Sequence, residues 1–419
     1  MVGESWLLIT LILLIISLIT QQTPLLLVTL LVFLTGLLIR IWSHYALAGV
    51  IHEHGLSNAY AFSGDVVSVE VSVTNRKILP LPVVEIGLEA PEELKVLNGS
   101  VIPAVGDAFR VNLFSLFSMG WYRKVTRRYQ IECSKRGHYM FGPSFMTVRD
   151  PFGFTTREAE GYEKDRLLVY PRILSLKELG LPSTEIIGER RIRRQLFEDP
   201  LRIVSTRSYV QGDPLSRINW KATARRGELQ SRVLESTTTP NLAIFLDVNT
   251  METRFQAPLE ASLESAIVVA GSIANHAING GYNVGLYVNE PYRGAREPIR
   301  LAPSRHPGHL QRILVALAHP QGWPLHSIER VLMKEGRNIP WGASIVVVTS
   351  TPTVALLGSI RRFKKAGRSL SLIQIGNTTG ITLPRDIQTH FVSDRIHQRV
   401  MESREVTLLD ESDHGSVEV

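Results

Sequence analysis

The chain opens with two long apolar runs separated by a short polar turn. Residues 6–20 and 25–39 are apolar except for a few Thr, Ser and Gly positions, and Gln21-Gln22-Thr23-Pro24 lies between them. A helix needs roughly 20 apolar residues, and at least about 17, to cross a bilayer, so each run is just long enough with its flanks. Pro24 suits the first turn of a second helix. The pattern therefore predicts a two-helix transmembrane hairpin over residues 1–45.

A secretory signal peptide is the competing interpretation of this segment. The residues before the first apolar run include Glu4 and no Lys or Arg, and the two runs together are about twice too long for a signal peptide. Trp6 and Trp42 lie at the two outer ends, where indole rings favour the membrane interface. The turn lacks cations and Arg40 follows the second run, which predicts a two-span cell-membrane protein with cytoplasmic soluble domains.

The region after the hairpin shows the period-two pattern of half-buried strands. Val67, Val69, Val71 and Val73 alternate with polar residues, and a second alternating run at 84–88 ends at Pro91. Short strands separated by Pro and Gly are typical of antiparallel sandwiches. The pattern predicts a β-sandwich-like domain over residues 46–172.

The C-terminal half alternates continuous apolar strands with amphipathic helices. We expect strands at 241–247, 283–289, 344–349 and 369–375, and helices at 258–279, 307–319 and 353–366. This alternation predicts a doubly wound α/β domain over residues 241–400, followed by a C-terminal tail at 401–419. Ligands of such folds lie at the carboxyl ends of strands, where Asp247 stands.

A segment rich in Arg and aromatic residues, 173–240, joins the two domains. Asp213-Pro214 resembles a helix N-cap followed by Pro at the first helical position, and Arg217 is spaced to pair with Asp213. Trp220 follows on the same face. The segment is either a capped short helix held by Trp220 or a surface that docks a partner, and both roles are compatible.

Charge and composition narrow the possible classes of protein. The net charge is +7, which is compatible with binding to nucleic acid or to anionic lipid, and equally with a membrane protein whose soluble part faces the cytosol. No basic stripe interleaved with aromatic residues is present, so we expect no nucleic-acid binding; the basic run at 190–194 is interpreted as a solvated face or a contact for an acidic partner. A single cysteine, Cys133, excludes an intramolecular disulfide.

Catalytic motifs are missing from the sequence. The chain has no P-loop, no Gly-x-Ser-x-Gly, no His-Glu-x-x-His and no Cys-His cluster. His52 and His54 flank Glu53 and are interpreted as residues near the membrane interface. We therefore expect a non-enzymatic protein, with an uncharacterised enzyme as the alternative.

The segment between residues 197 and 225 resembles the signature of the family known as domain of unknown function 58. The upstream Arg136-Gly137, Gly142-Pro143 and Tyr170-Pro171 pairs and the N-terminal hairpin are also similar to that family. The signature matches are Arg207, Tyr209, Gly212, Asp213, Arg217, Ile218, Trp220, Ala224 and Arg225. The resemblance implies a C-terminal domain similar to von Willebrand A domains. It also implies association with a MoxR-type AAA ATPase, a proposed chaperone for assembling complexes or inserting metals.

The resemblance also raises the question of a metal site. Von Willebrand A domains often bind a divalent cation through Asp-x-Ser-x-Ser after the first strand, and this chain has Asp247-Val248-Asn249-Thr250-Met251. Asn249 offers an amide oxygen, whereas the Met251 thioether is a poor ligand for Mg²⁺. We therefore expect a degenerate site at Asp247 and Asn249 and no cofactor. A metal-dependent, adhesion-type binding domain is the alternative to a membrane-anchored assembly protein that docks its partner through Arg207, Tyr209, Gly212, Asp213, Arg217, Trp220 and Arg225.

Overall fold

The structure is a computed structural model that divides into two compact units, Met1–Pro171 and Arg172–Val419. It describes residues 3–104, 109–150, 155–182, 198–211, 213, 215, 218–236, 240–251, 257–340, 342–376, 383–394 and 396. The basic run at 190–194, Gly212, Pro214, Arg217 and the expected tail at 401–419 lie outside these residues. Each unit is described by itself below.

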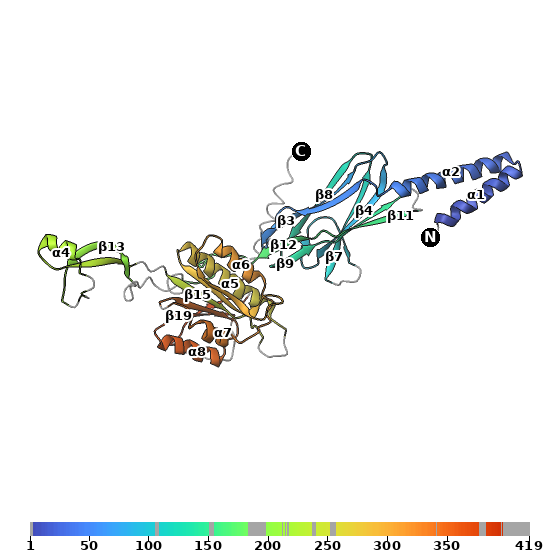
Figure 1. The fold of residues 1–419 in the computed structure, drawn as a ribbon. Helices are drawn as coiled ribbons and strands as arrows, with labels where there is room; N and C mark the ends of the chain where they lie inside the picture. Colours follow the sequence, from blue (N-terminus) through green and yellow to red (C-terminus); the bar gives the residue numbers. More distant parts are fainter. Residues whose placement is uncertain are drawn as a thin grey trace, which may run out of the picture. The chain divides into compact units, whose positions relative to one another are not determined.

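Two apolar helices open the first unit, α1 (Gly3–Ile19) and α2 (Thr23–Tyr45), and they run alongside each other (Figure 1). The Ser17 hydroxyl is buried between them, 3.0 Å from the Thr29 hydroxyl, and donates to the backbone oxygen of Leu14. Most of the other side chains are exposed Leu, Ile and Val. By length and composition α2 could cross a membrane; the described part of α1 gives only a shorter apolar stretch, Ile9–Ile19.

The rest of the first unit is built from β-strands. One sheet has the order β1-β3-β8-β5, a second has the order β11-β10-β4-β7-β6, and a third, smaller sheet has the order β2-β12-β9 (Figure 1). The strands are β1 (Val50–Leu56), β2 (Tyr60–Phe62), β3 (Val66–Asn75), β4 (Leu81–Pro91), β5 (Lys95–Val96), β6 (Ser100–Pro103), β7 (Arg110–Met119), β8 (Lys124–Glu132), β9 (Gly137–Phe141), β10 (Ser144–Arg149), β11 (Thr156–Gly161) and β12 (Asp165–Tyr170).

The alternating pattern of the sequence accounts for the core of these sheets. Val67, Val69, Val71 and Val73 of β3 are at most 2% exposed and share one apolar cluster with alternate residues of β4. Successive side chains of a strand point to opposite faces, so every second residue of β3 enters the core. The strands predicted in this region are confirmed, and the first unit is rich in β-structure.

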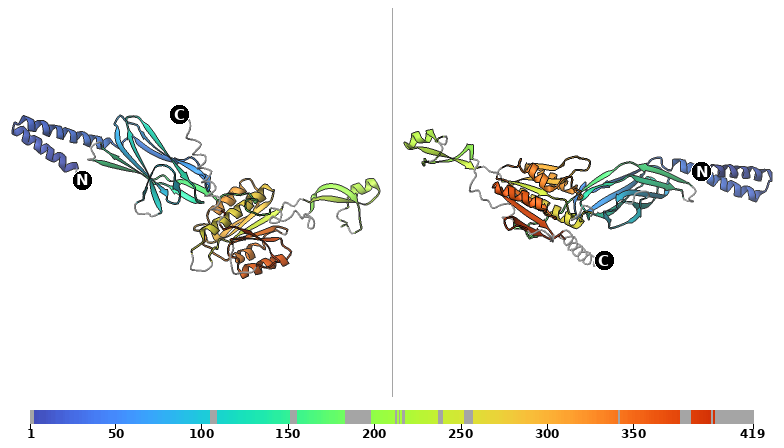
Figure 2. Two further views of the ribbon diagram at one scale, coloured as in Figure 1. Left: turned by 180° about the vertical axis from the view of Figure 1, so that it is seen from behind. Right: turned by 90° about the horizontal axis from the view of Figure 1, so that it is seen from below.

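The second unit contains a six-stranded sheet of order β17-β16-β15-β18-β19-β20, in which all neighbours are parallel except β17 and β16. Helices cover both faces (Figures 1 and 2). Leu242, Ile244 and Leu246 of β15 pack in one cluster with α5, and Ala243 and Phe245 lie in another. The elements are β15 (Asn241–Leu246), α5 (Glu260–Asn279), β16 (Asn283–Pro291), β17 (Pro298–Ser304), α6 (His309–Ala318), α7 (Ile328–Glu335), β18 (Ser344–Thr349), α8 (Val354–Lys365), β19 (Leu370–Ile375) and β20 (Gln388–Val392).

The strands and helices expected here are present within a few residues of their predicted ends. Three elements were not expected: β17, α7 and β20. Pro298 and Pro303 interrupt β17, which pairs only at the edge of the sheet, the place in a sheet that accepts Pro. Helix α5 is long and apolar enough to cross a membrane, but it is mostly buried and serves as the central helix of this domain.

The second unit also contains a separate antiparallel hairpin that carries a short helix. Strands β13 (Glu198–Ser208) and β14 (Gln230–Ser236) pair with each other, and α4 (Trp220–Arg226) lies in the connection between them (Figure 1). We call β13, α4, β14 and their connecting residues the arm.

Candidate functional site

Asp247 follows β15 directly and lies at the carboxyl ends of three neighbouring strands. Its side chain is buried and accepts hydrogen bonds from the Asn289 amide of β16 at 2.8 Å and from the Thr349 hydroxyl of β18 at 2.8 Å. The backbone N–H of Asn249 donates to it at 3.0 Å. Both carboxylate oxygens are therefore used, and Asp247 ties β15 to the strands on either side.

The surrounding residues extend this network inside the protein. Asn289 uses its amide oxygen to accept from the backbone N–H of Val248 at 2.9 Å. The Asn249 side-chain oxygen accepts from the backbone N–H of Met251 at 3.3 Å, and the Asn249 backbone oxygen accepts from the Thr351 hydroxyl at 2.9 Å. The polar groups at this sheet edge thus satisfy one another.

Burial raises the pKa of Asp247 from 3.8 to about 6. The hydrogen bonds from the backbone of Asn249 and from the side chains of Thr349 and Asn289 act in the opposite direction, because each favours the charged carboxylate. Desolvation is the larger effect, so the carboxyl group costs more to ionise here than in water.

These residues do not fit a divalent cation. A hard cation needs several free oxygen ligands, whereas the Asp247 oxygens face N–H and O–H donors and Asn289 turns its NH₂ group toward them. The Asn249 oxygen is turned to a backbone N–H. Within the described residues no three His, Cys, Asp or Glu side chains form a metal-binding group. Asn289 and Thr349 follow Asp247 by 42 and 102 residues, so the local sequence around Asp247 does not identify them as its partners.

Three of the predicted arm residues meet in one turn. The Arg207 guanidinium lies 2.7 Å from one Asp213 oxygen, and the other Asp213 oxygen accepts from the backbone N–H of Val210 at 3.3 Å. The Tyr209 hydroxyl donates to the Asp213 backbone oxygen at 3.3 Å. Arg207, Tyr209 and Asp213 therefore brace this turn structurally.

The cap predicted at Asp213-Pro214 stays a prediction, because Pro214 and residues 216–217 lie outside the described residues. Helix α4 begins at Trp220, and the Asn219 side chain accepts from the backbone N–H of Ala222 at 3.3 Å. The Asp213 carboxylate is engaged by the Arg207 guanidinium and by the backbone N–H of Val210. The expected partner of Asp213, Arg217, lies outside the described residues.

Of the two roles considered for the segment, the exposure of Trp220 does not support a short helix held by this side chain. Trp220 is 66% exposed, and no residue of α4 is buried. The buried residue is its neighbour Ile218, at 4% exposure, beside Gln230 and Ser231 of β14. Arg225 lies exposed in the last turn of α4, together with Arg226, so the helix presents an indole and cations to solvent.

His52 and His54 do not form a metal-ligand group with Glu53. They lie on β1, where Glu53 is exposed and both histidines are half-buried. The His52 ring nitrogen lies 3.0 Å from the Ser144 hydroxyl, and burial together with the nearby His54 lowers the pKa of His52. These contacts tie β1 to β10.

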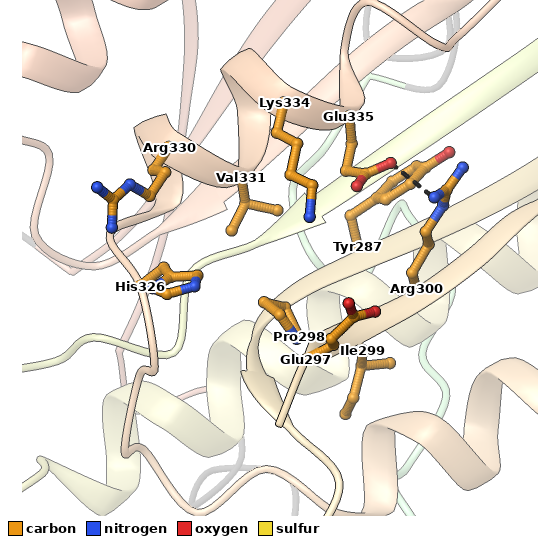
Figure 3. A pocket seen from close by; sticks show the side chains of 10 residues that line it. All are labelled: Tyr287, Glu297, Pro298, Ile299, Arg300, His326, Arg330, Val331, Lys334 and Glu335. Atoms are coloured by element: carbon orange, nitrogen blue, oxygen red, sulfur yellow. Dashed lines mark ion pairs between the residues drawn. The ribbon is translucent and has the colours of Figure 1, made fainter. Parts of the chain in front are cut away.

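A cavity of about 270 Å³ was not foreseen from the sequence, since α7 forms one of its walls (Figure 3). Arg300 and Glu335 form an ion pair at 3.1 Å on one side, and the Lys334 side chain reaches in from α7. The lining is Tyr287, Glu297, Pro298, Ile299, Arg300, His326, Arg330, Val331, Lys334 and Glu335. This mixture of cations and carboxylates favours no single ligand charge.

A buried carboxylate fixes the loop after α6. Glu290 accepts hydrogen bonds from the backbone N–H groups of Gln321 at 2.9 Å, Gly322 at 3.0 Å and Trp323 at 3.3 Å. The loop holds Trp323 at 59% exposure. This exposed indole is comparable with Trp220 but belongs to a different element.

Most of the arm and most of the Asp247 network lie in a segment that resembles a family of proteins. Residues 205–350 match the family described as "Protein of unknown function DUF58". The chain is 26% identical over 221 residues to "Uncharacterized protein YeaD" of Bacillus subtilis (strain 168), an alignment that covers 52% of this chain and 50% of YeaD. The chain thus spans about half the length of the curated relative that it matches.

Among solved structures, the chain is similar to a CARDB domain from Pyrococcus furiosus, with 11% identity, a TM-score of 0.20 and coverage of 29% of this chain and 91% of that domain. It is also similar to a cohesin module of a family 33 glycoside hydrolase from Clostridium perfringens, with 11% identity, a TM-score of 0.20 and coverage of 29% and 97%. These scores are too low for either structure to inform the function of this chain.

Proposed function

We propose that the chain is a membrane-anchored, non-enzymatic interaction protein that works with a MoxR-type AAA ATPase in the assembly or maturation of a protein complex. The observation that carries the proposal is the surface of α4, where Trp220 is 66% exposed and no residue is buried. Large exposed aromatic residues next to Arg are typical of interaction hot spots. The kind of partner is proposed from what the resemblance of the signature residues to the domain of unknown function 58 family implies.

The chemistry of the arm supports a docking role. Arg207, Tyr209 and Asp213 brace its turn, which fixes the backbone without exposing a reactive group. Lys221, Arg225 and Arg226 are exposed on α4 and make its surface cationic. The arm therefore suits an acidic surface of the ATPase, with Trp220 entering an apolar pocket in that surface.

The anchor is the N-terminal helix pair. Its outward side chains are apolar, and its internal hydroxyl groups bond within the pair, as a lipid environment requires. We propose that α1 and α2 span the membrane as a hairpin and that both soluble units face the cytoplasm.

The α/β domain supports the proposal through its fold. An Asp after the first strand of a sheet with helices on both faces suits a von Willebrand A-like domain, and the closed Asp247 network suits one that has lost its cation. Such a domain would act as a scaffold for the arm.

The test is capture of a MoxR-type ATPase co-expressed with the full chain. Trp220→Ala should weaken capture by about tenfold or more, because truncating a hot-spot aromatic residue typically costs at least that much. Trp323→Ala is the matched control, since it removes an indole of similar exposure, 59% against 66%, from another part of the domain. Capture that survives Trp220→Ala, or that falls equally in both variants, would overturn the proposed docking role.

A further inference from the structure

The end of α2 is fixed to a loop of the β-structure in the same unit. The Lys77 ammonium, in the loop between β3 and β4, donates to the backbone oxygens of Tyr45 at 2.7 Å and Ala48 at 2.9 Å, and also to that of Ala46. The Trp42 indole donates to the Pro80 backbone oxygen at 3.0 Å. Lys77 thus satisfies carbonyl groups that a helix leaves without partners at its C-terminus.

A second loop joins the first. The buried Asn75 side chain donates to the Leu79 backbone oxygen at 2.9 Å and to the Gly120 backbone oxygen, between β7 and β8, at 2.9 Å. The backbone N–H of Tyr122 donates to the Lys77 backbone oxygen at 3.1 Å. Residues 76–80 and 120–124 therefore form one braced surface beside the end of α2, which we call the exit platform.

The exit platform exposes apolar and aromatic side chains. Ile78 is 70% exposed, Trp121 is 65% exposed and Tyr122 is 69% exposed, and Tyr45 at the end of α2 is 55% exposed. Isolated exposed apolar residues are ordinary, but a group of this kind marks an interaction surface.

The charged side chains of the exit platform and of the adjoining end of α2 are all positive. Residues 76–80 and 120–124 of the platform, together with residues 40–48, contain no Asp or Glu and five Lys or Arg: Arg40, Arg76, Lys77, Arg123 and Lys124. Arg76, Arg123 and Lys124 are exposed, and none of them forms an ion pair with another residue that the structure describes. The surface thus combines aromatic rings with unopposed positive charge.

The position of the platform identifies its partner. Helix α2 has 23 residues, is about 34 Å long and could cross a membrane by its length and composition. Its apolar part ends before Arg40, and residues after this point would emerge into the headgroup region. The platform is bonded to this same end of α2, at the depth where Trp, Tyr and cations gather.

We infer that the exit platform rests on the anionic phospholipid headgroups of the membrane surface, with Trp121 and Tyr122 in the interface and Arg76, Arg123 and Lys124 against the lipid phosphates. This inference rests on the proposed membrane anchoring of α1 and α2. It adds that the β-rich part of the first unit is held against the bilayer and is not free on a flexible tether.

Quenching of tryptophan fluorescence by brominated lipids tests the inference on the full chain. The protein is reconstituted in vesicles that contain phosphatidylglycerol and lipids brominated near the top of the acyl chain. Trp6, Trp42 and Trp121 should lie within reach of the bromine, so Trp121→Phe should remove about one third of the quenched signal. Trp323→Phe, a control in the second unit, should leave the quenched signal unchanged.

A charge variant tests the role of the cations. Replacing Arg76, Arg123 and Lys124 together by Gln should reduce the quenching of Trp121 to the level seen in vesicles of phosphatidylcholine alone. If the quenched signal of Trp121→Phe equals that of the wild type while Trp42 remains quenched, the chain is anchored but the platform does not contact lipid. The inference is then overturned, and the platform would instead be a surface that contacts a protein partner. If no tryptophan is quenched, the anchor itself fails, which overturns the proposed function as well.

Discussion

At the scale of single residues, Asp247 shows how burial and hydrogen bonding set the character of one carboxyl group. Desolvation raises its pKa to about 6, while Asn249, Thr349 and Asn289 hold it with donors. A buried carboxylate with every oxygen engaged favours a structural link between strands over a reactive or metal-binding role.

The first prediction concerns the pH dependence of stability. The folded-state pKa of Asp247 lies above its ordinary value of 3.8, so its contribution to stability is fully present below pH 3.8 and is lost as pH rises through about 6. Asp247→Asn has no titrating group there. Relative to the wild type, the variant should therefore gain about 3 kcal/mol of unfolding free energy between pH 3.5 and pH 7. The measurement is denaturant unfolding of both proteins at both pH values. If the difference in unfolding free energy between the two proteins is the same at both pH values, the pKa of Asp247 is not raised in the folded state.

The second prediction concerns divalent cations. Since donors surround the Asp247 oxygens and Met251 replaces a hydroxyl ligand, we expect no tight binding of Mg²⁺ or Mn²⁺. Isothermal calorimetry of the purified chain should give no micromolar site. A micromolar affinity that disappears in Asp247→Ala would show that the network opens to take a metal.

The sequence was informative about Asp247 and uninformative about its partners. An apolar run that ends in Asp can be recognised from a few neighbouring residues, so the position of Asp247 at the end of a strand could be predicted. Asn289 and Thr349 reach Asp247 only because β16 and β18 flank β15, and strand order does not follow from hydrophobic periodicity. Nothing in the local sequence of Thr349 distinguishes it from an ordinary strand end.

At the scale of elements, the arm shows two kinds of local side-chain contact with the backbone. Arg207 and the Val210 N–H engage both Asp213 oxygens, and the Asn219 side chain caps α4. Strand-to-strand contacts within the arm bury Ile218 and leave Trp220 outside. Sequence alone could identify the motif, but the face that becomes exposed depends on this pairing.

The third prediction separates stability from docking within the arm. Ile218→Ala removes a buried side chain and should lower the unfolding free energy by about 2–4 kcal/mol. Trp220→Ala removes a side chain that is 66% exposed and should change it by less than about 0.5 kcal/mol. Hydrogen exchange of the β13 and β14 amides reports on the arm directly. Faster exchange in Trp220→Ala than in Ile218→Ala would mean that the indole packs on the arm after all.

At the scale of the whole molecule, each unit follows a different hydrophobic period. Period-two alternation in Val67–Val73 produced strands with one buried face, and continuous apolar runs such as Ala243–Leu246 produced strands buried on both faces. These patterns predicted the two kinds of architecture. They did not predict β17 or β20, because edge strands bury less surface and their sequences carry Pro or polar residues.

The last prediction concerns membrane topology, which the helix pair and the charge distribution set together. A hairpin places both of its flanks on one side of the membrane, and cations favour the cytoplasmic side. The turn at 21–24 has no Lys or Arg, whereas Arg40 lies in the last part of α2, and Arg76, Arg123 and Lys124 follow the helix in the chain. A fluorescent reporter that matures only in the cytoplasm should therefore be active when fused after Val419, and a phosphatase that needs export should be inactive there. The same phosphatase inserted between Gln21 and Gln22 is the internal control and should be active.

Phosphatase activity at Val419 would place the soluble units outside the cell, where no cytoplasmic AAA ATPase could reach the arm.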